Sequence, residues 1–247
     1  MAKGYEAKFI ISNTRISDAG IYQCSYYFKS STEMRCSDYS DKAHINITDP
    51  SIPKPSIKVK PGLRNALHSS VSIECQGQED DLNFFLRKAN TGEILQESSA
   101  LATGTATFHF FKVRSEDAGS YICQYHHRSS PFIWSEPSDP VKLIVEDPSL
   151  PKPSIKVKSG QHEVGKNVTI NCKGPKRGLT FSLHKSKNFT ALQMLKAEGN
   201  TAKFSLPLLR LEDAGNYTCQ YYHGENPFVS SQPSDPAQVV VTGKKLG

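Results

Sequence analysis

Hydrophobic and polar residues alternate with a period of two along most of the chain. In residues 71–75 apolar and polar side chains alternate strictly, and residues 168–172 repeat the pattern. Side chains at this period share one face of a β-strand. Glycines separate the short alternating segments, where turns are expected. Helical periodicity is limited to single turns near residues 114–117 and 210–213. The pattern therefore predicts an all-β protein.

Alternation also predicts which side chains are buried, because every second residue of a half-buried strand faces the core. Two such sets recur about 97 residues apart, so we expect two separate cores. The predicted inward-facing residues are Val71, Ile73, Phe84, Leu86, Phe108, Phe110 and Tyr121, followed by Val168, Ile170, Phe181, Leu183, Phe204, Leu206 and Tyr217.

Longer signatures recur at nearly the same interval. Residues 49–60 return almost unchanged as 147–158, an offset of 98 residues. The segment Asp-Ala-Gly-x-Tyr-x-Cys ends at Cys24 and recurs at Cys123 and Cys219. An interval near 97 residues is too long for a solenoid repeat and is typical of a chain of small independent domains.

Four of the six cysteines form two pairs of nearly equal spacing. Cys75 and Cys123 are 48 residues apart, and Cys172 and Cys219 are 47 apart. In each pair the first cysteine lies in an alternating strand and the second lies in a Tyr-x-Cys strand. This is the arrangement of a disulfide that joins the two sheets of a β-sandwich. A zinc site is the rival interpretation, and it is disfavoured because the chain has no Cys-x-x-Cys. Disulfides imply an oxidising compartment, so we expect a secreted or cell-surface protein.

These residues resemble a known family. Asp-x-Gly-x-Tyr-x-Cys resembles the sequence around strand F of the immunoglobulin domain. The Tyr of that strand forms the tyrosine corner, in which its hydroxyl makes a hydrogen bond to the backbone just upstream. Residues 150–154 and 134–140 resemble the start and end segments of domains in the leukocyte receptor group. This group includes the leukocyte and killer-cell immunoglobulin-like receptors, platelet glycoprotein VI, the osteoclast-associated receptor and the alpha-1-B plasma glycoprotein. Phe84 and Phe181 stand where most immunoglobulin domains bury a Trp, a departure that is common in this group.

The resemblance implies an all-β chain of tandem immunoglobulin-like (C2-type) β-sandwiches, two complete and one truncated at its N-terminus. It covers residues 50–243 as two full domains and residues 5–48 more loosely. The expected divisions are 1–48 for strands E, F and G of a truncated domain, 49–146 and 147–243 for complete domains, and 244–247 for the start of a stalk or tail.

Residues 1–48 are too few for a complete domain. A complete unit places its second cysteine about 70 residues after its start, whereas Cys24 follows only 23 residues. Cys24 therefore lacks its usual partner, and either it bonds to Cys36 or both thiols stay free. Three strands cannot close a two-sheet core, so we expect four side chains to stay partly exposed, those of Phe9, Ile11, Tyr22 and Cys24.

Charge and hydropathy exclude further classes of protein. The 30 Lys and Arg against 24 Asp and Glu give a net charge of +6, and the basic residues are scattered along the sequence. We therefore expect no nucleic-acid partner and only a weak preference for acidic glycans or proteins. No apolar run approaches the ~18 residues that span a membrane, so membrane attachment would need a segment outside this chain.

We find no motif for catalysis or for metal or cofactor binding, and we expect no enzyme. His126 and His127 fall in the F–G turn region, where a solvated loop or a partner contact is expected rather than metal or acid–base chemistry. Glu116 and Asp117 are adjacent carboxylates, but Asp117 belongs to the fold signature, so we expect a salt bridge or a turn cap there rather than a glycosidase pair. Four Asn-x-Thr sequons instead indicate an extracellular glycoprotein, at Asn46, Asn167, Asn188 and Asn216.

Two functions fit these observations. The first is the ligand-binding ectodomain of a cell-surface immune-type receptor, on the extracellular side of the plasma membrane, which regulates leukocyte signalling through a protein such as a class I histocompatibility-like molecule or collagen. The second is a soluble, secreted plasma binding glycoprotein of the alpha-1-B type.

Receptors of this group often bind ligands near interdomain elbows, so the resemblance implies candidates at the domain ends. Prolines in residues 146–153 should limit bending there. Phe132 and Phe228 could contact ligand or merely pack the junctions, and both interpretations stay open. The candidate ligand-binding residues are Arg177, Tyr222, His223 and Phe228 near this elbow, and His126, His127 and Arg128 at the other end of the second domain.

Overall fold

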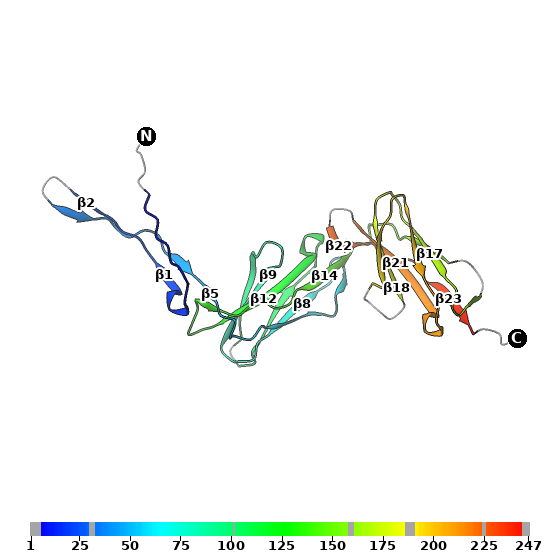
Figure 1. Cartoon of the computed structure of the whole chain (residues 1–247), viewed down its shortest axis with the longest axis horizontal. Coiled ribbons are helices and arrows are strands. Elements are labelled where there is room, and N and C mark those ends of the chain that lie inside the picture. The colour runs from blue at the N-terminus through cyan, green and yellow to red at the C-terminus, as the bar shows by residue number, and fades with distance from the viewer. Residues whose placement is uncertain are drawn as a thin grey trace, which may run out of the picture.

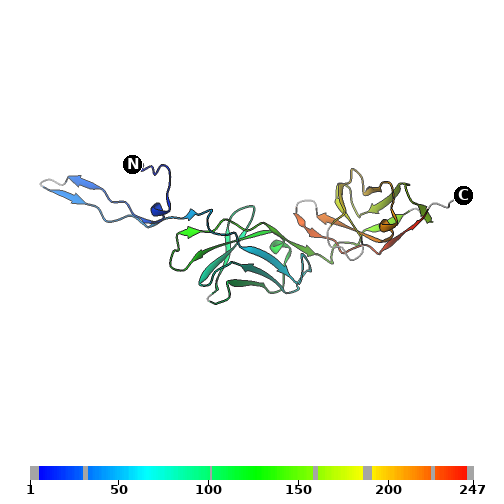
Figure 2. The same cartoon turned by 60° about the horizontal axis from the view of Figure 1, so that its bottom comes forward.

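The computed structural model describes residues 6–29, 33–100, 102–157, 161–185, 191–223 and 226–243. The chain is elongated and has three parts in sequence order (Figures 1 and 2). We call residues 6–48 the N-terminal segment, strands β6 to β14 the middle unit and strands β15 to β23 the C-terminal unit. Regular structure in these ranges consists of β-strands and short 3-10 helices, so the predicted all-β class is confirmed.

The N-terminal segment contains η1 (Ile16–Asp18), β1 (Gly20–Tyr22), β2 (Tyr27–Lys29), β3 (Met34–Cys36), β4 (Ala43–Ile45) and β5 (Ile47–Thr48). The middle unit contains β6 (Ser56–Lys60), β7 (Arg64–Ala66), β8 (Val71–Gln76), β9 (Leu82–Lys88), β10 (Ile94–Ala100), β11 (Thr105–Phe110), η2 (Ser115–Asp117), β12 (Gly119–His127), β13 (Ile133–Trp134) and β14 (Val141–Glu146). The C-terminal unit contains β15 (Ser154–Val157), β16 (Gln161–Glu163), β17 (Val168–Lys173), β18 (Thr180–Lys185), β19 (Gln193–Lys196), β20 (Thr201–Leu206), η3 (Leu211–Asp213), β21 (Gly215–His223), β22 (Asn226–Ser230) and β23 (Ala237–Thr242).

Each of the two larger units is a sandwich of two sheets. In the middle unit, β11–β8–β6 faces the sheet β10–β9–β12–β14. In the C-terminal unit, β15–β17–β20 faces the sheet that contains β19, β18, β21 and β23. Disulfides join the facing sheets at Cys75–Cys123 and Cys172–Cys219, with Cα atoms 6.3 and 6.2 Å apart. Closing loops of this length contributes about 4 kcal/mol in the chain-entropy account.

The cores lie between the sheets, where alternation places them. All residues predicted to face inwards belong to one of the two cores; Phe110 and Leu206 are half-buried at the edges and the others are buried. Phe84 and Phe181 are fully buried at the positions that resemble those of a strand C Trp.

The same corner is built three times, before β1, β12 and β21. In the C-terminal unit the Arg210 backbone N–H donates to the Asp213 carboxylate over 2.7 Å, and the Tyr217 hydroxyl donates to the Asp213 carbonyl over 2.7 Å. Tyr121 makes the equivalent bond to Asp117. Burial, and secondarily the nearby Asp carboxylate, raises the pKa of both tyrosines.

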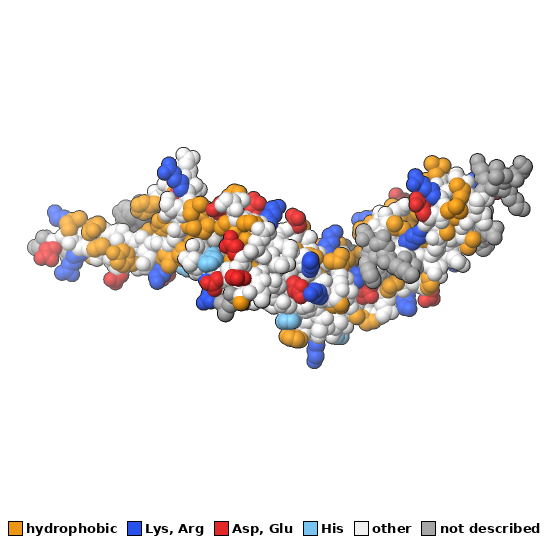
Figure 3. Space-filling model, turned by 90° about the horizontal axis from the view of Figure 1, so that it is seen from below, with side chains coloured by type: hydrophobic (Ala, Val, Ile, Leu, Met, Phe, Trp, Pro, Cys, Tyr) orange, Lys and Arg blue, Asp and Glu red, His pale blue; other side chains and the backbone are white. Residues whose placement is uncertain are grey.

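The described part of the N-terminal segment consists of two-stranded sheets, β1–β4 and β2–β3. Its apolar side chains face solvent, as Figure 3 shows, with Phe9 78% exposed and Tyr27 73% exposed. Cys24 and Cys36 are exposed and unbonded, so of the two alternatives left open the structure has the free thiols.

Candidate functional site

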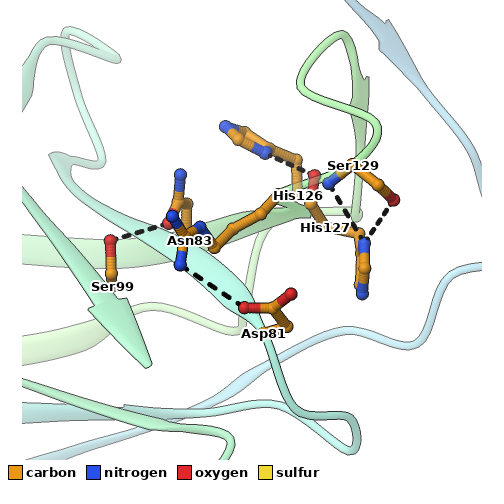
Figure 4. A network of polar contacts seen from close by, with 7 residues as sticks. Asp81, Asn83, Ser99, His126, His127 and Ser129 are labelled. Atoms are coloured by element: carbon orange, nitrogen blue, oxygen red, sulfur yellow. Dashed lines mark hydrogen bonds and ion pairs between the residues drawn. The ribbon is translucent and has the colours of Figure 1, made fainter. Parts of the chain in front are cut away.

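The F–G turn of the middle unit, residues 128–132 between β12 and β13, is held by polar contacts (Figure 4). Arg128 Nη1 lies 3.5 Å from Asp81 Oδ1, and both side chains are about half exposed. His127 Nδ1 lies 2.6 Å from Ser129 Oγ. An exposed ion pair of this kind adds little stability, so the Arg128 guanidinium is available to a partner.

His126, one residue earlier, is not on the surface. It is only 5% exposed, and its ring lies 5.2 Å from Phe85 and 5.0 Å from the Trp134 ring. Its Nδ1 is 3.0 Å from the His127 carbonyl oxygen. Of the three candidates at this turn, the structure therefore exposes Arg128 and, in part, His127, and packs His126 inside.

His126 belongs to an aromatic cluster on the outer face of the sheet, formed with Phe85, Arg87 and Trp134. The Phe85 and Trp134 ring centroids are 4.5 Å apart, and the Arg87 guanidinium lies 5.2 Å from the Trp134 ring. Burial lowers the pKa of Arg87. Sequence reasoning missed Phe85 and Arg87. The signal that could have found them is the alternation of β9, which turns Phe84 inwards and both of these residues outwards.

The aromatic cluster adjoins the junction between the N-terminal segment and the middle unit. There β5 pairs in parallel with β13, placing Ile47 opposite Ile133. The Ile47 N–H donates to the Phe132 carbonyl over 2.8 Å, and the His44 ring packs edge-on against Phe132 at 5.8 Å. Phe132 therefore packs this junction.

The junction between the middle and C-terminal units repeats this arrangement. Strand β14 pairs in parallel with β22, placing Val145 opposite Val229. Phe228 and Val229 pack against the core of the middle unit, and Leu150 contacts both cores. Phe228 is therefore a junction residue in the structure, like Phe132.

A polar network beside this pairing links the two units further. Arg64 of β7 hydrogen-bonds the side-chain oxygen of Gln220, and its Nη2 lies 3.0 Å from His184 Nε2. Gln220 Nε2 donates to Glu146 Oε1 over 2.8 Å. Gln220 and His184 are buried, at 2% and 5% exposed. Hydrogen bonds to charged groups away from water are strong and directional, so the network holds the two sandwiches in one orientation.

The predicted residues of the C-terminal unit gather at this junction. Tyr222 is 5% exposed and pairs with Thr180 and Ser230 in the sheet. Arg177 is exposed in the turn that leads into β18, and Thr180 at the start of β18 lies next to the end of β21, so Arg177 is at the junction end. The backbone of His223 ends β21, and its side chain lies outside the described atoms.

The seven candidates thus form two groups at opposite ends of the middle unit, at its junctions with β5 and with β22 (Figure 1). The structure does not bring them together into one site. Arg177, Tyr222 and Phe228 lie at the second junction, and His126, His127 and Arg128 lie at the first.

Other predicted features concern the surface. Asn46, Asn167 and Asn216 are exposed, whereas Asn188 lies outside the described residues. Within the described ranges no three His, Cys, Asp or Glu side chains gather as a metal site would need. No helix in that part of the chain is long and apolar enough to span a membrane.

Comparisons with known proteins agree with this architecture. Immunoglobulin domain models match residues 61–136 and residues 152–241. Immunoglobulin superfamily member 1 of Mus musculus is 31% identical over 98% of this chain, which spans only 18% of that protein. T-cell-interacting, activating receptor on myeloid cells protein 1 of Mus musculus is 30% identical over 79% of this chain and 69% of its own length. Alpha-1B-glycoprotein of Homo sapiens is 28% identical over 94% of this chain and 46% of its length. The chain belongs to the immunoglobulin superfamily, within its leukocyte receptor group.

Proposed function

We propose that this chain is the ligand-binding ectodomain of a cell-surface immune-type receptor, which regulates leukocyte signalling by recognising a protein. The observation that carries the proposal is the junction of β14 with β22, where strand pairing, apolar packing and the Arg64–Gln220–Glu146 network fix two sandwiches relative to each other. A fixed junction gives a partner one composite surface and saves the entropy of ordering it on binding. The similarity to a protein named as a receptor on myeloid cells supports this role.

The proposed contact surface is the exposed rim of this junction. Arg177 is exposed there, and arginine is among the residue types that dominate binding energy at protein interfaces. Tyr222 is buried next to this rim, and Phe228 is half-buried against the core of the middle unit. Protein ligands such as a class I histocompatibility-like molecule or collagen, met on the extracellular side of the plasma membrane, are the first to test.

The experiment displays the chain on cells and measures its binding to these ligands. We expect Arg177→Glu and His223→Ala to weaken binding at least about tenfold, as loss of an interface anchor does. Arg210→Glu is the matched control, because it makes the same charge change on an exposed Arg at the opposite end of the same unit. Wild-type binding by both junction variants would move the site elsewhere.

A second candidate function is a soluble, secreted plasma binding glycoprotein, favoured by the similarity to alpha-1B-glycoprotein over 94% of this chain. The two candidates differ in where the natural protein resides. Antibody detection of the natural protein at the cell surface would support the receptor, and its accumulation only in the surrounding medium would support the plasma glycoprotein.

A further inference from the structure

The outer face of the β15–β17–β20 sheet in the C-terminal unit is basic and carries no acidic residue. Lys156, Lys173 and Lys203 point outwards from its three strands and are exposed, and we call them the lysine face. The strands contain no Asp or Glu. Among the described residues, none of the three lysines takes part in an ion pair of the kind seen elsewhere in the chain.

Strand register fixes how these lysines are spaced. Lys156 and Lys203 lie opposite Asn171 from the two sides, since Asn171 is on the central strand β17. Their backbones are therefore about 10 Å apart, which is two strand spacings. Lys173 follows Asn171 by two residues on the same face and completes a triangle. Small polar residues surround these positive charges: Ser154 and Thr201 lie opposite Lys173, and Thr169 and Ser205 lie on the other side of Asn171.

The matching sheet of the middle unit shows that the fold does not require this arrangement. There the outward residues of β6–β8–β11 include Lys58, Lys60 and Glu74, and Glu74 lies in the central strand opposite Lys58. Lys60 Nζ contacts Glu74 Oε1 at 2.6 Å, so the central carboxylate neutralises part of the basic charge. In the C-terminal unit the corresponding position is Asn171, which leaves the lysines uncompensated.

Two polar atoms at the edge of the lysine face lack partners among the described residues. Asn171 Oδ1 and His162 Nε2 are buried and form no hydrogen bond within the part of the chain that the structure describes, and both residues line a hollow together with Lys156 and Asn167. A buried polar atom without a partner costs free energy, and a polar ligand in the hollow could remove that cost.

We propose that the lysine face binds a linear sulfated polysaccharide. Sulfate and carboxylate groups repeat along such a chain, so several can meet the three ammonium groups at once, while sugar hydroxyls can bond to Asn171 and His162. A protein partner fits less well, because the face offers no aromatic or apolar anchor. An anionic membrane would call for apolar side chains that insert, and single-stranded nucleic acid would call for aromatic platforms. This site is separate from the proposed junction surface.

The experiment measures binding of the full chain to immobilised heparin as a function of salt. Three contacts predict a fall in affinity of roughly 40-fold between about 50 and 200 mM salt, because bound counterions are released from the polymer. Each single Lys→Gln change on the lysine face should reduce the slope of log affinity against log salt by about one. The triple variant K156Q/K173Q/K203Q should lose the salt-dependent binding altogether.

Two matched controls separate the lysine face from net charge. The variant K58Q/K142Q/K176Q removes the same charge from exposed lysines elsewhere and should bind like the wild type. Asn171→Glu installs the carboxylate that the middle unit has at this position, and we expect it to weaken binding at least tenfold without changing the melting temperature.

Three results would overturn the proposal. The first is wild-type affinity for heparin in the variant K156Q/K173Q/K203Q. The second is an equal loss of affinity in the control variant K58Q/K142Q/K176Q, which would show that net charge alone causes the binding. The third is lysine-dependent binding to phosphatidylserine vesicles as tight as that to heparin, which would identify a membrane surface instead.

Discussion

The hydroxyl of Tyr217 bonds to the Asp213 carbonyl across a corner that the chain builds three times. Tyr217 is buried, so removing its hydroxyl leaves that carbonyl without its partner. We expect Tyr217→Phe to lower the free energy of unfolding by about 1–2 kcal/mol, measured by urea denaturation. Tyr22 makes the same bond at 2.9 Å but is 41% exposed, so Tyr22→Phe should cost less than about 0.5 kcal/mol. Equal effects of the two changes would contradict this explanation.

Buried tyrosines also predict how stability depends on pH. Burial raises the pKa of Tyr121, Tyr125, Tyr217 and Tyr221 above the ordinary value near 10. The folded state therefore favours the neutral form, so this stability is fully present below about pH 10 and is lost as pH rises above it. The urea concentration at the unfolding midpoint should decrease as the pH rises from about 10 to 12. In the Tyr121→Phe variant this decrease should be less steep. A midpoint constant over that range would contradict the prediction.

Single residues show where sequence reasoning succeeds and where it stops. Alternation assigns Phe84 to the core correctly, because burial on one face of a strand depends on local pattern. It gives no reason to expect Phe85 or His126 to be buried as well. Their burial depends on Trp134, which comes from a different strand and covers them on the outer face. Contacts of that kind depend on tertiary packing.

At the scale of elements, the repeated pairings β5–β13 and β14–β22 are the least predictable feature. The sequence predicts a stiff elbow from its prolines, but a parallel pairing between units depends on how closely two folded sandwiches approach. Phe132 and Phe228 illustrate this, because the sequence left their role open and the structure packs both at junctions.

The polar network at the second junction can be tested by removing its guanidinium. Arg64→Ala takes away the donor to Gln220 and the contact with His184. We expect the pair-distance distribution from small-angle X-ray scattering to broaden, because the two units then move relative to each other. The melting temperature should stay within about 2 °C of the wild-type value. Arg114→Ala is the control, since Arg114 is exposed and its side chain pairs with exposed Glu116. Scattering identical to the wild type would show that strand pairing alone holds the junction.

At the scale of the whole molecule, the N-terminal segment differs from the two sandwiches. Its exposed apolar side chains, such as Phe9 and Tyr27, favour self-association in water. A variant that begins at residue 43 keeps β5 and its pairing with β13. We expect this variant to stay monomeric at concentrations where the full chain aggregates, with an unchanged melting temperature. Light scattering and calorimetry test this, and a lower melting temperature in the shorter variant would show that the segment stabilises the sandwiches.

We propose that the middle and C-terminal units act as one fixed recognition surface. The most direct measurement is the affinity of the full chain for its protein ligand before and after a flexible Gly-Ser insertion between Asp147 and Pro148, where the Asp147 N–H bonds to the Ser230 carbonyl at 2.9 Å. The insertion is combined with Arg64→Ala, because the contacts of Arg64 with Gln220 and His184 would otherwise still hold the two units together. The two changes together loosen the junction while leaving each sandwich intact, so we expect at least about a tenfold loss of affinity. Unchanged affinity would contradict it and would place the binding surface on one unit alone.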